Sequence, residues 1–209
     1  KLDQIIANIS FNEWPENLPD FLPLMQNFLD IYVESKSTQG IFNENSTHVY
    51  RTLFYFLKLI SASTKITLKR RSQLLEIFIS NLPDFFQSIF KECSLNMESN
   101  KSNISVINTN ENLALESFLE FSGQLFLVIQ DNQEITEVLS QFLFETFIET
   151  PSAIVKSIQS EYNPTAIPNG NNIIEQKISE LEKLSATAFN NLTVLLSKST
   201  YLEHLVQPI

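Results

Sequence analysis

The stretch of sequence that decides the fold is ENLALESFLEFSGQLFLVIQDNQEITEVLSQFLFETF, residues 111–147. Over residues 111–130 one helix face carries residues three or four positions apart, which are apolar except for Ser122; the apolar ones are Leu115, Phe118, Leu119, Leu125, Phe126 and Ile129. Over residues 134–147 this spacing returns at Ile135, Val138, Leu139, Phe142, Leu143 and Phe147. The stretch therefore predicts two helices joined by a short turn.

Similar helix pairs are predicted on both sides of this stretch. The first pair covers residues 1–33, the second 45–91, the third 111–149 with a short helix at 151–160, and the fourth 172–209 with its second helix truncated. Polar stretches at residues 35–44, 92–110 and 162–172 predict the loops between the pairs. Pro83 is expected to kink or split its helix near residues 80–82, because proline removes a backbone donor.

These pairs predict an all-α fold, an α-solenoid of HEAT-type antiparallel helix pairs. A helix pair cannot bury its apolar face alone, so successive pairs stack into a superhelix. The chain has only three glycines in 209 residues, which disfavours the hairpins and phosphate-binding loops that depend on glycine. The spacing is irregular and longer than a 34-residue tetratricopeptide repeat, so a diverged HEAT array is favoured. A compact helical bundle is the structural alternative.

Charge and composition exclude several classes of protein. With 24 acidic and 14 basic residues, the net charge of −10 disfavours nucleic acid and anionic membranes as partners and favours basic proteins. One cysteine and two histidines exclude a disulfide framework and a His/Cys zinc site. No uninterrupted apolar run approaches the roughly 18 residues of a membrane span, so no membrane insertion is expected.

A short turn carries a resemblance to a known family. Trp14-Pro15-Glu16-Asn17-Leu18-Pro19-Asp20-Phe21 resembles the W-P-E-x-x-P-x-L turn of an early HEAT repeat in the karyopherin-β nuclear transport receptors. Residues 51–58 (RTLFYFLK), 60–63 (ISAS) and 69–71 (KRR), with Phe78, are similar to the importin eleven branch. Through residues 113–147 and 173–208 only the order and lengths of the helices agree. Pro83 and residues 92–110 depart from the family pattern.

The resemblance implies a segment from the N-terminal half of a nuclear import receptor. Such a receptor binds protein cargo and the small GTPase Ran in its GTP form, one excluding the other, and its outer grooves bind Phe-Gly nucleoporins. It would be found in the nucleus, the cytoplasm and the pores of the nuclear envelope. The alternative function is a HEAT-repeat scaffold of a multiprotein complex unrelated to nuclear transport.

A stripe of acidic residues is the candidate partner-binding surface. No Lys or Arg lies between Lys101 and Lys156, a span that contains many carboxylates. Glu134, Glu137, Gln141 and Glu145 lie three or four residues apart on the predicted helix 134–147, with Glu149 just past its end, so they fall on one face. We call Glu134, Glu137, Glu145 and Glu149 the acidic stripe. This pattern predicts a surface for basic cargo or for Ran, and a merely solvated helix face is the alternative.

No catalytic motif is present. The sequence contains no G-x-x-x-x-G-K-[ST], no G-x-S-x-G and no H-E-x-x-H, and its two histidines, His48 and His204, have no supporting pattern. We therefore expect a binding protein rather than an enzyme, with no catalytic residue, cofactor or metal. Trp14 is expected to pack in the core between adjacent helices.

Overall fold

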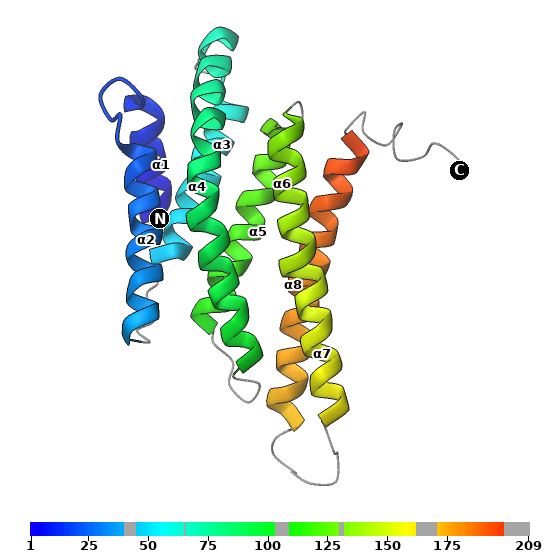
Figure 1. Cartoon of the computed structure of the whole chain (residues 1–209). Coiled ribbons are helices and arrows are strands. Elements are labelled where there is room, and N and C mark those ends of the chain that lie inside the picture. Colours follow the sequence, from blue (N-terminus) through cyan, green and yellow to red (C-terminus); the bar gives the residue numbers. More distant parts are fainter. Residues whose placement is uncertain (40–44, 65, 103–108, 130–131, 162–170, 199–209) are drawn as a thin grey trace.

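The computed structural model describes residues 1–39, 45–64, 66–102, 109–129, 132–161 and 171–198 (Figure 1). Within these ranges the chain forms eight α-helices, one π-helical turn and no strand. They are α1 (Leu2–Glu13), α2 (Phe21–Gln39), α3 (Asn45–Ala62), α4 (Leu68–Ser102), α5 (Thr109–Ile129), α6 (Gln133–Phe144), the π turn η1 (Glu145–Glu149), α7 (Thr150–Glu161) and α8 (Asn171–Lys198). The predicted all-α class is confirmed for this part of the chain.

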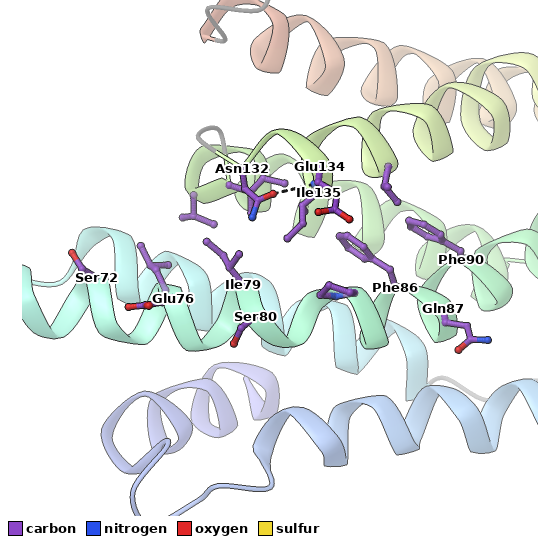
Figure 2. A pocket seen from close by; sticks show the side chains of 15 residues that line it. Ser72, Glu76, Ile79, Ser80, Phe86, Gln87, Phe90, Asn132, Glu134 and Ile135 are labelled. Atoms are coloured by element: carbon purple, nitrogen blue, oxygen red, sulfur yellow. Dashed lines mark hydrogen bonds between the residues drawn. The ribbon is translucent and has the colours of Figure 1, made fainter.

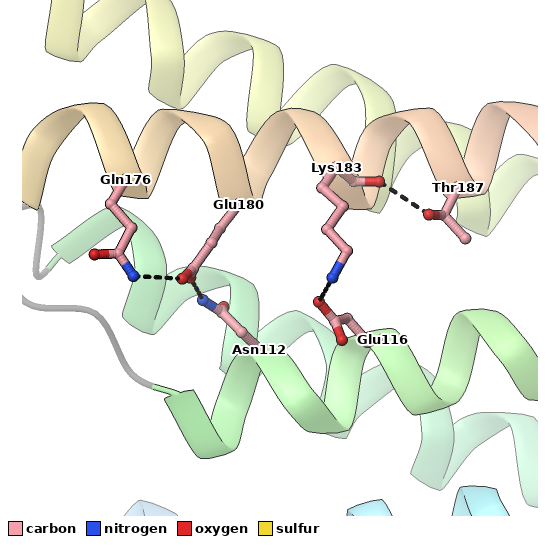
Figure 3. Close-up of polar contacts among 6 residues, drawn as sticks. All are labelled: Asn112, Glu116, Gln176, Glu180, Lys183 and Thr187. Atoms are coloured by element: carbon pink, nitrogen blue, oxygen red, sulfur yellow. Dashed lines mark hydrogen bonds and ion pairs between the residues drawn. The ribbon is translucent and has the colours of Figure 1, made fainter.

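The helices stand side by side in two layers (Figure 1). One layer contains α1, α3, α5 and α8, each packed against the next, and the other contains α2, α4 and the run α6–η1–α7. Neighbours α5 and α8 run parallel, because their contacts follow the same order along both helices: Asn112 contacts Glu180 and, one turn later, Glu116 contacts Lys183 (Figure 3). The connections between helices therefore pass from one layer to the other.

A continuous cluster of buried side chains fills the space between the layers. Aromatic rings join successive helices within it. Trp14 meets Phe56 edge-on with ring centroids 5.5 Å apart, and the Phe21 ring lies 4.9 Å from that of Phe56. Tyr50 then meets Phe118 of α5 at 5.4 Å. Aromatic pairs in these geometries stabilise beyond their buried area, so the ring contacts tie the helices into one core.

Helix α4 is continuous over 35 residues, so the prediction that Pro83 splits it is wrong. Pro83 lies on the exposed side of the helix, whereas Phe78, Leu82 and Phe85 are buried. Proline cannot donate to the carbonyl group four residues earlier, but on the exposed side water can take that place. Packing of the core face on both sides of Pro83 outweighs the one lost backbone hydrogen bond.

The loop predicted for residues 92–110 is wrong over its first part, because α4 continues to Ser102. Glu92, Asn96 and Asn100 lie four residues apart on this extension, and all three are fully buried. Their spacing is helical, but polar residues give no apolar periodicity to detect. Helix α2 likewise extends to Gln39, beyond the expected start of a loop at residue 35. Residues 103–108 lie outside the described part.

A π turn and a proline lie at the junction of α6 and α7. Pro151 is the second residue of α7, and it has no N–H group to donate to the carbonyl of Phe147. The N–H of Thr150, the residue before Pro151, bonds to the carbonyl of Glu145, five residues back, which widens the helix by one residue. The chain thus passes from α6 to α7 without leaving the helical path.

Helix α5 is the one described helix that is long and apolar enough to cross a membrane by length and composition. However, 61% of its apolar window is buried inside the protein, where it packs between α3 and α8. A helix surrounded by other helices is apolar on most sides. Its composition is therefore explained by its central place in the core.

Candidate protein-binding groove between α4 and α6

A groove of about 870 Å³ lies between α4 and α6, and the end of α5 closes one side of it (Figure 2). Its floor is formed by Phe86, Ile129 and Ile135, which are buried. Its walls carry further apolar side chains that are partly or fully exposed; they are Leu75, Ile79, Pro83, Phe90, Val128 and Val138. The groove therefore offers a long apolar surface that no other described element covers.

The sequence of α4 carries two apolar faces, and this is why the groove exists. Phe78, Leu82 and Phe85 point into the core, while Ile79 and Phe86, each one residue further on, line the groove. A helix that is apolar over such a wide arc needs partners on more than one side. The described residues fill the side of Phe78, Leu82 and Phe85, whereas they cover the groove side only in part, burying Phe86 and leaving Ile79 partly exposed.

The position of α6 sets the other wall. The Asn132 side chain accepts a hydrogen bond from the Ile135 backbone N–H at 3.1 Å, so it caps the first turn of α6 (Figure 2). Further along the groove, the Phe90 ring of α4 stacks on Phe142 of α6 with centroids 3.8 Å apart. The two helices therefore meet at this stack and leave the groove open between it and the α6 cap.

The charged groups that line the groove are two carboxylates. Glu76 comes from α4 and Glu134 from the first turn of α6, and both are exposed. None of the described lining residues is Lys or Arg. Lys69, Arg70 and Arg71 lie on α4 directly before the lining segment, and Lys91 lies directly after it. The central part of the groove thus combines an apolar surface with negative charge.

The four residues of the acidic stripe are all exposed. The structure brings only Glu134 to the groove, where it joins Glu76, a residue that the sequence did not single out. Glu137 accepts a hydrogen bond from Gln133 at 3.1 Å, and Glu145 accepts one from Gln141 at 2.8 Å. Glu149 lies at the end of η1. Partner binding by the stripe stays a prediction.

The turn that carries the family resemblance is a packing and ion-pair site. Trp14 is only 2% exposed, as expected for a core residue. Arg70, at the start of α4, donates to the Trp14 carbonyl at 3.2 Å and to a Glu16 carboxylate oxygen at 2.5 Å. The Arg70 hydrogen bond lowers the pKa of Glu16. Pro15 and Pro19 complete the turn, whose residues bind the first helix pair to the second.

A buried polar network links α3 to α4, and only the spacing of four along α4 signals it in the sequence. The Tyr50 hydroxyl donates to one oxygen of the Glu92 carboxylate at 2.6 Å, and the Asn96 amide donates to the other oxygen. Cys93 lies 3.7 Å from the Tyr50 hydroxyl. Burial raises the pKa of both Tyr50 and Cys93 well above their ordinary values, and the nearby Glu92 carboxylate adds to both shifts.

The network continues from α4 to α5 and α8. The Asn100 amide donates to the Asn112 side-chain oxygen at 3.0 Å, and Asn112 donates in turn to Glu180 of α8 (Figure 3). Nearby, burial lowers the pKa of Lys177, while the carboxylates of Glu111 and Glu180 act in the opposite direction. These contacts orient four helices, and none of the groove-lining residues belongs to them.

No group of three or more His, Cys, Asp or Glu side chains in the described ranges could hold a metal ion. The chemistry that the described site supports is binding: apolar contact along the groove and attraction of positive charge by Glu76 and Glu134. Comparison with family models, with curated proteins and with solved structures finds no match to this chain.

Proposed function

We propose that this chain is a HEAT-type solenoid segment that binds other proteins. The two-layer order supports it, because helices alternate between layers and equivalent helices lie next to one another. A helical bundle with one central core has no need for this alternation. In a repeat array the second helices of all the pairs together form one surface. Here that surface is formed by α2, α4 and the α6–η1–α7 run.

One observation carries the binding function: the apolar groove between α4 and α6. Monomeric proteins rarely leave large contiguous apolar patches exposed unless they bind something there. Val138, in the groove wall, is 44% exposed although it is apolar. The groove lies between two adjacent second helices of the array, so a bound partner would contact two repeats at once.

Site-specific photo-crosslinking tests this function. A photoreactive amino acid at Val138 should yield discrete protein adducts in the native cell, because that side chain faces the groove. The matched control is Ile173 on α8, which is 43% exposed and lies outside the groove. The proposal requires adducts that form from position 138 and are lost when Ile79, on the partly exposed wall of the groove, is replaced by Asp. Equal adducts from both positions would refute it.

We further propose, from the resemblance at residues 14–19 and 51–78, that the protein is a nuclear import receptor. Its partners would then be basic protein cargo, Ran in the GTP form and Phe-Gly nucleoporins. A pull-down of the intact protein with Ran loaded with GTP or with GDP tests this directly. Binding to the GTP form alone supports a receptor, whereas absent or nucleotide-independent binding favours the alternative, a HEAT-repeat scaffold.

A further inference from the structure

We infer that the groove between α4 and α6 binds an amphipathic helix of a partner protein, with basic residues beside its apolar face. This inference rests on the proposed binding function and specifies the shape and charge of the ligand. Three observations carry it: the length of the groove, the lack of backbone partners in its walls, and its two carboxylates.

The length of the groove matches a helix of several turns. Its α6 wall extends from Asn132 to Val138, and its longer α4 wall extends from Ser72 to Phe90. At 1.5 Å per residue this segment is about 27 Å long, which is the length of a helix of about 18 residues. A helix of that length presents about five turns of apolar side chains to the groove, enough to cover it from end to end.

The walls of the groove select a helix over an extended segment. The walls are themselves helices, whose backbone groups are already paired within each helix. An extended ligand on this apolar surface would leave many of its own N–H and C=O groups without partners, at a cost for each one. A helical ligand pairs its backbone internally and needs only apolar side chains to fill the groove.

The charges select basic residues for the edges of the ligand. Glu76 on α4 and Glu134 on α6 stand on opposite sides of the groove (Figure 2). A helix lying between them can place Lys or Arg on both flanks of its apolar face, where complementary charge fixes its orientation. Residues 199–209 of the chain itself contain Glu203 and neither Lys nor Arg, so they do not meet this requirement.

Fluorescence anisotropy with labelled 18-residue peptides tests the inference. The probe has Leu at helical spacing and Lys on both flanks, and the comparison peptides have the same composition in scrambled order or a central proline. We expect the helical probe to bind at least about tenfold more tightly than either one. Circular dichroism should show that the probe becomes helical when it binds.

Variants of the protein show whether the probe occupies the groove. Val138→Asp and the pair Glu76→Lys with Glu134→Lys should each weaken binding about tenfold, and the charge effect should shrink at 1 M salt. The controls Ile173→Asp and the pair Glu175→Lys with Glu182→Lys, all on α8, should leave binding unchanged. Equal weakening by the control variants would overturn the inference.

The outcomes separate this inference from the function on which it rests. If the scrambled or proline peptide binds as tightly, and Val138→Asp still weakens it, the groove binds extended segments and the helix inference is wrong. If no peptide binds while crosslinks still form at position 138, a protein ligand of other chemistry occupies the groove. If crosslinks are also absent, the proposed binding function fails as well.

Discussion

The ring of Phe90 on α4 stacks on that of Phe142 on α6, with centroids 3.8 Å apart and planes 13° from parallel. Phe142 also meets Phe118 of α5 edge-on at 6.0 Å and Phe147 of η1 at 6.3 Å. Phe142 thus connects α4 and α6, which lie in one layer, to α5, which lies in the other. The same contact sets the separation of α4 and α6 at the end of the groove.

Truncation of the core around this stack should be costly. We expect Leu119→Ala to lower the free energy of unfolding by about 2–5 kcal/mol, because it leaves a cavity, and Phe142→Ala, at a half-buried position, to lower it by less than the about 3–5 kcal/mol of a fully buried Phe. Leu119 is fully buried, so its site has little freedom to collapse. Urea unfolding followed by circular dichroism measures both values. Unchanged midpoints would show that the assigned core face is wrong.

The buried network should make the Tyr50 hydroxyl important. Tyr50→Phe removes the donor to Glu92 and leaves a carboxylate oxygen without that partner in the core. We expect a loss of about 1–3 kcal/mol in unfolding free energy, the usual cost of an unsatisfied buried group. Tyr55→Phe, at a half-buried position on the same helix, is the control and should change stability by less than about 0.5 kcal/mol.

Stability should fall at alkaline pH. Burial raises the pKa of Cys93 and of Tyr50, so the folded chain keeps protons that the unfolded chain releases above about pH 8.5 for Cys and about pH 10 for Tyr. Their contribution is therefore complete below pH 8.5 and is lost as the pH rises, with a slope of up to about 1.4 kcal/mol per pH unit for each group.

Unfolding midpoints between pH 7 and pH 11 measure this slope. Cys93→Ala should remove the part that begins near pH 8.5, and Tyr50→Phe should remove the part that begins near pH 10. The difference in slope between each variant and the unmodified protein gives the contribution of Cys93 or Tyr50 alone, without that of the other tyrosines and the lysines. A slope that neither variant alters would mean that these two groups titrate normally in the folded state.

Gly123 lies where α5 and α8 come close together. A Cβ atom at this position would be 2.9 Å from Oδ1 of Asn191, whose amide donates to the Leu119 carbonyl at 2.8 Å and to Ser122 Oγ at 3.1 Å. Gly123→Ala should therefore destabilise by about 1–2 kcal/mol, because these hydrogen bonds must shift. With Asn191→Ala in addition, the same change should stabilise by up to about 1 kcal/mol, the helix propensity of alanine.

Charge reversal distinguishes binding by the whole acidic stripe from binding by the groove alone. Glu137→Lys with Glu145→Lys should change the unfolding free energy by less than about 0.5 kcal/mol, because both residues are exposed. If the whole stripe binds a basic partner, this pair should weaken the lysine-flanked probe as much as the Glu76 and Glu134 pair does. If only the groove binds it, the effect should be clearly smaller. Anisotropy titrations at low and high salt compare the two pairs.

Glu180 on α8 differs from its neighbouring carboxylates in its tertiary contacts. Glu180 is a surface carboxylate by sequence periodicity, but the structure shows that it accepts hydrogen bonds from Asn112 and Gln176. Reversing Glu180 would disturb the α5–α8 contact, so Glu180 cannot serve as a charge-reversal control, whereas Glu175 and Glu182 can. Both of these side chains are exposed on α8.

Helix positions were predictable because they depend on local spacing. The stretch 111–147 predicted the helices that the structure shows as α5 and α6, with ends within three residues of those predicted. The prediction failed over residues 92–102, where Glu92, Asn96 and Asn100 occupy buried positions of a helix. Their partners, Tyr50 and Asn112, lie far away in the sequence, so no local pattern identifies them as interior.

The sequence by itself determined the all-α class, the approximate positions of the helices and the exposed position of the acidic stripe, because each follows from side-chain spacing along one helix. Only the tertiary structure decided that Glu76 and Glu134 share one groove, and which apolar face of α4 enters the core. Both depend on how α4 and α6 pack. That packing is set by contacts such as Phe90 on Phe142, between residues that no periodicity relates.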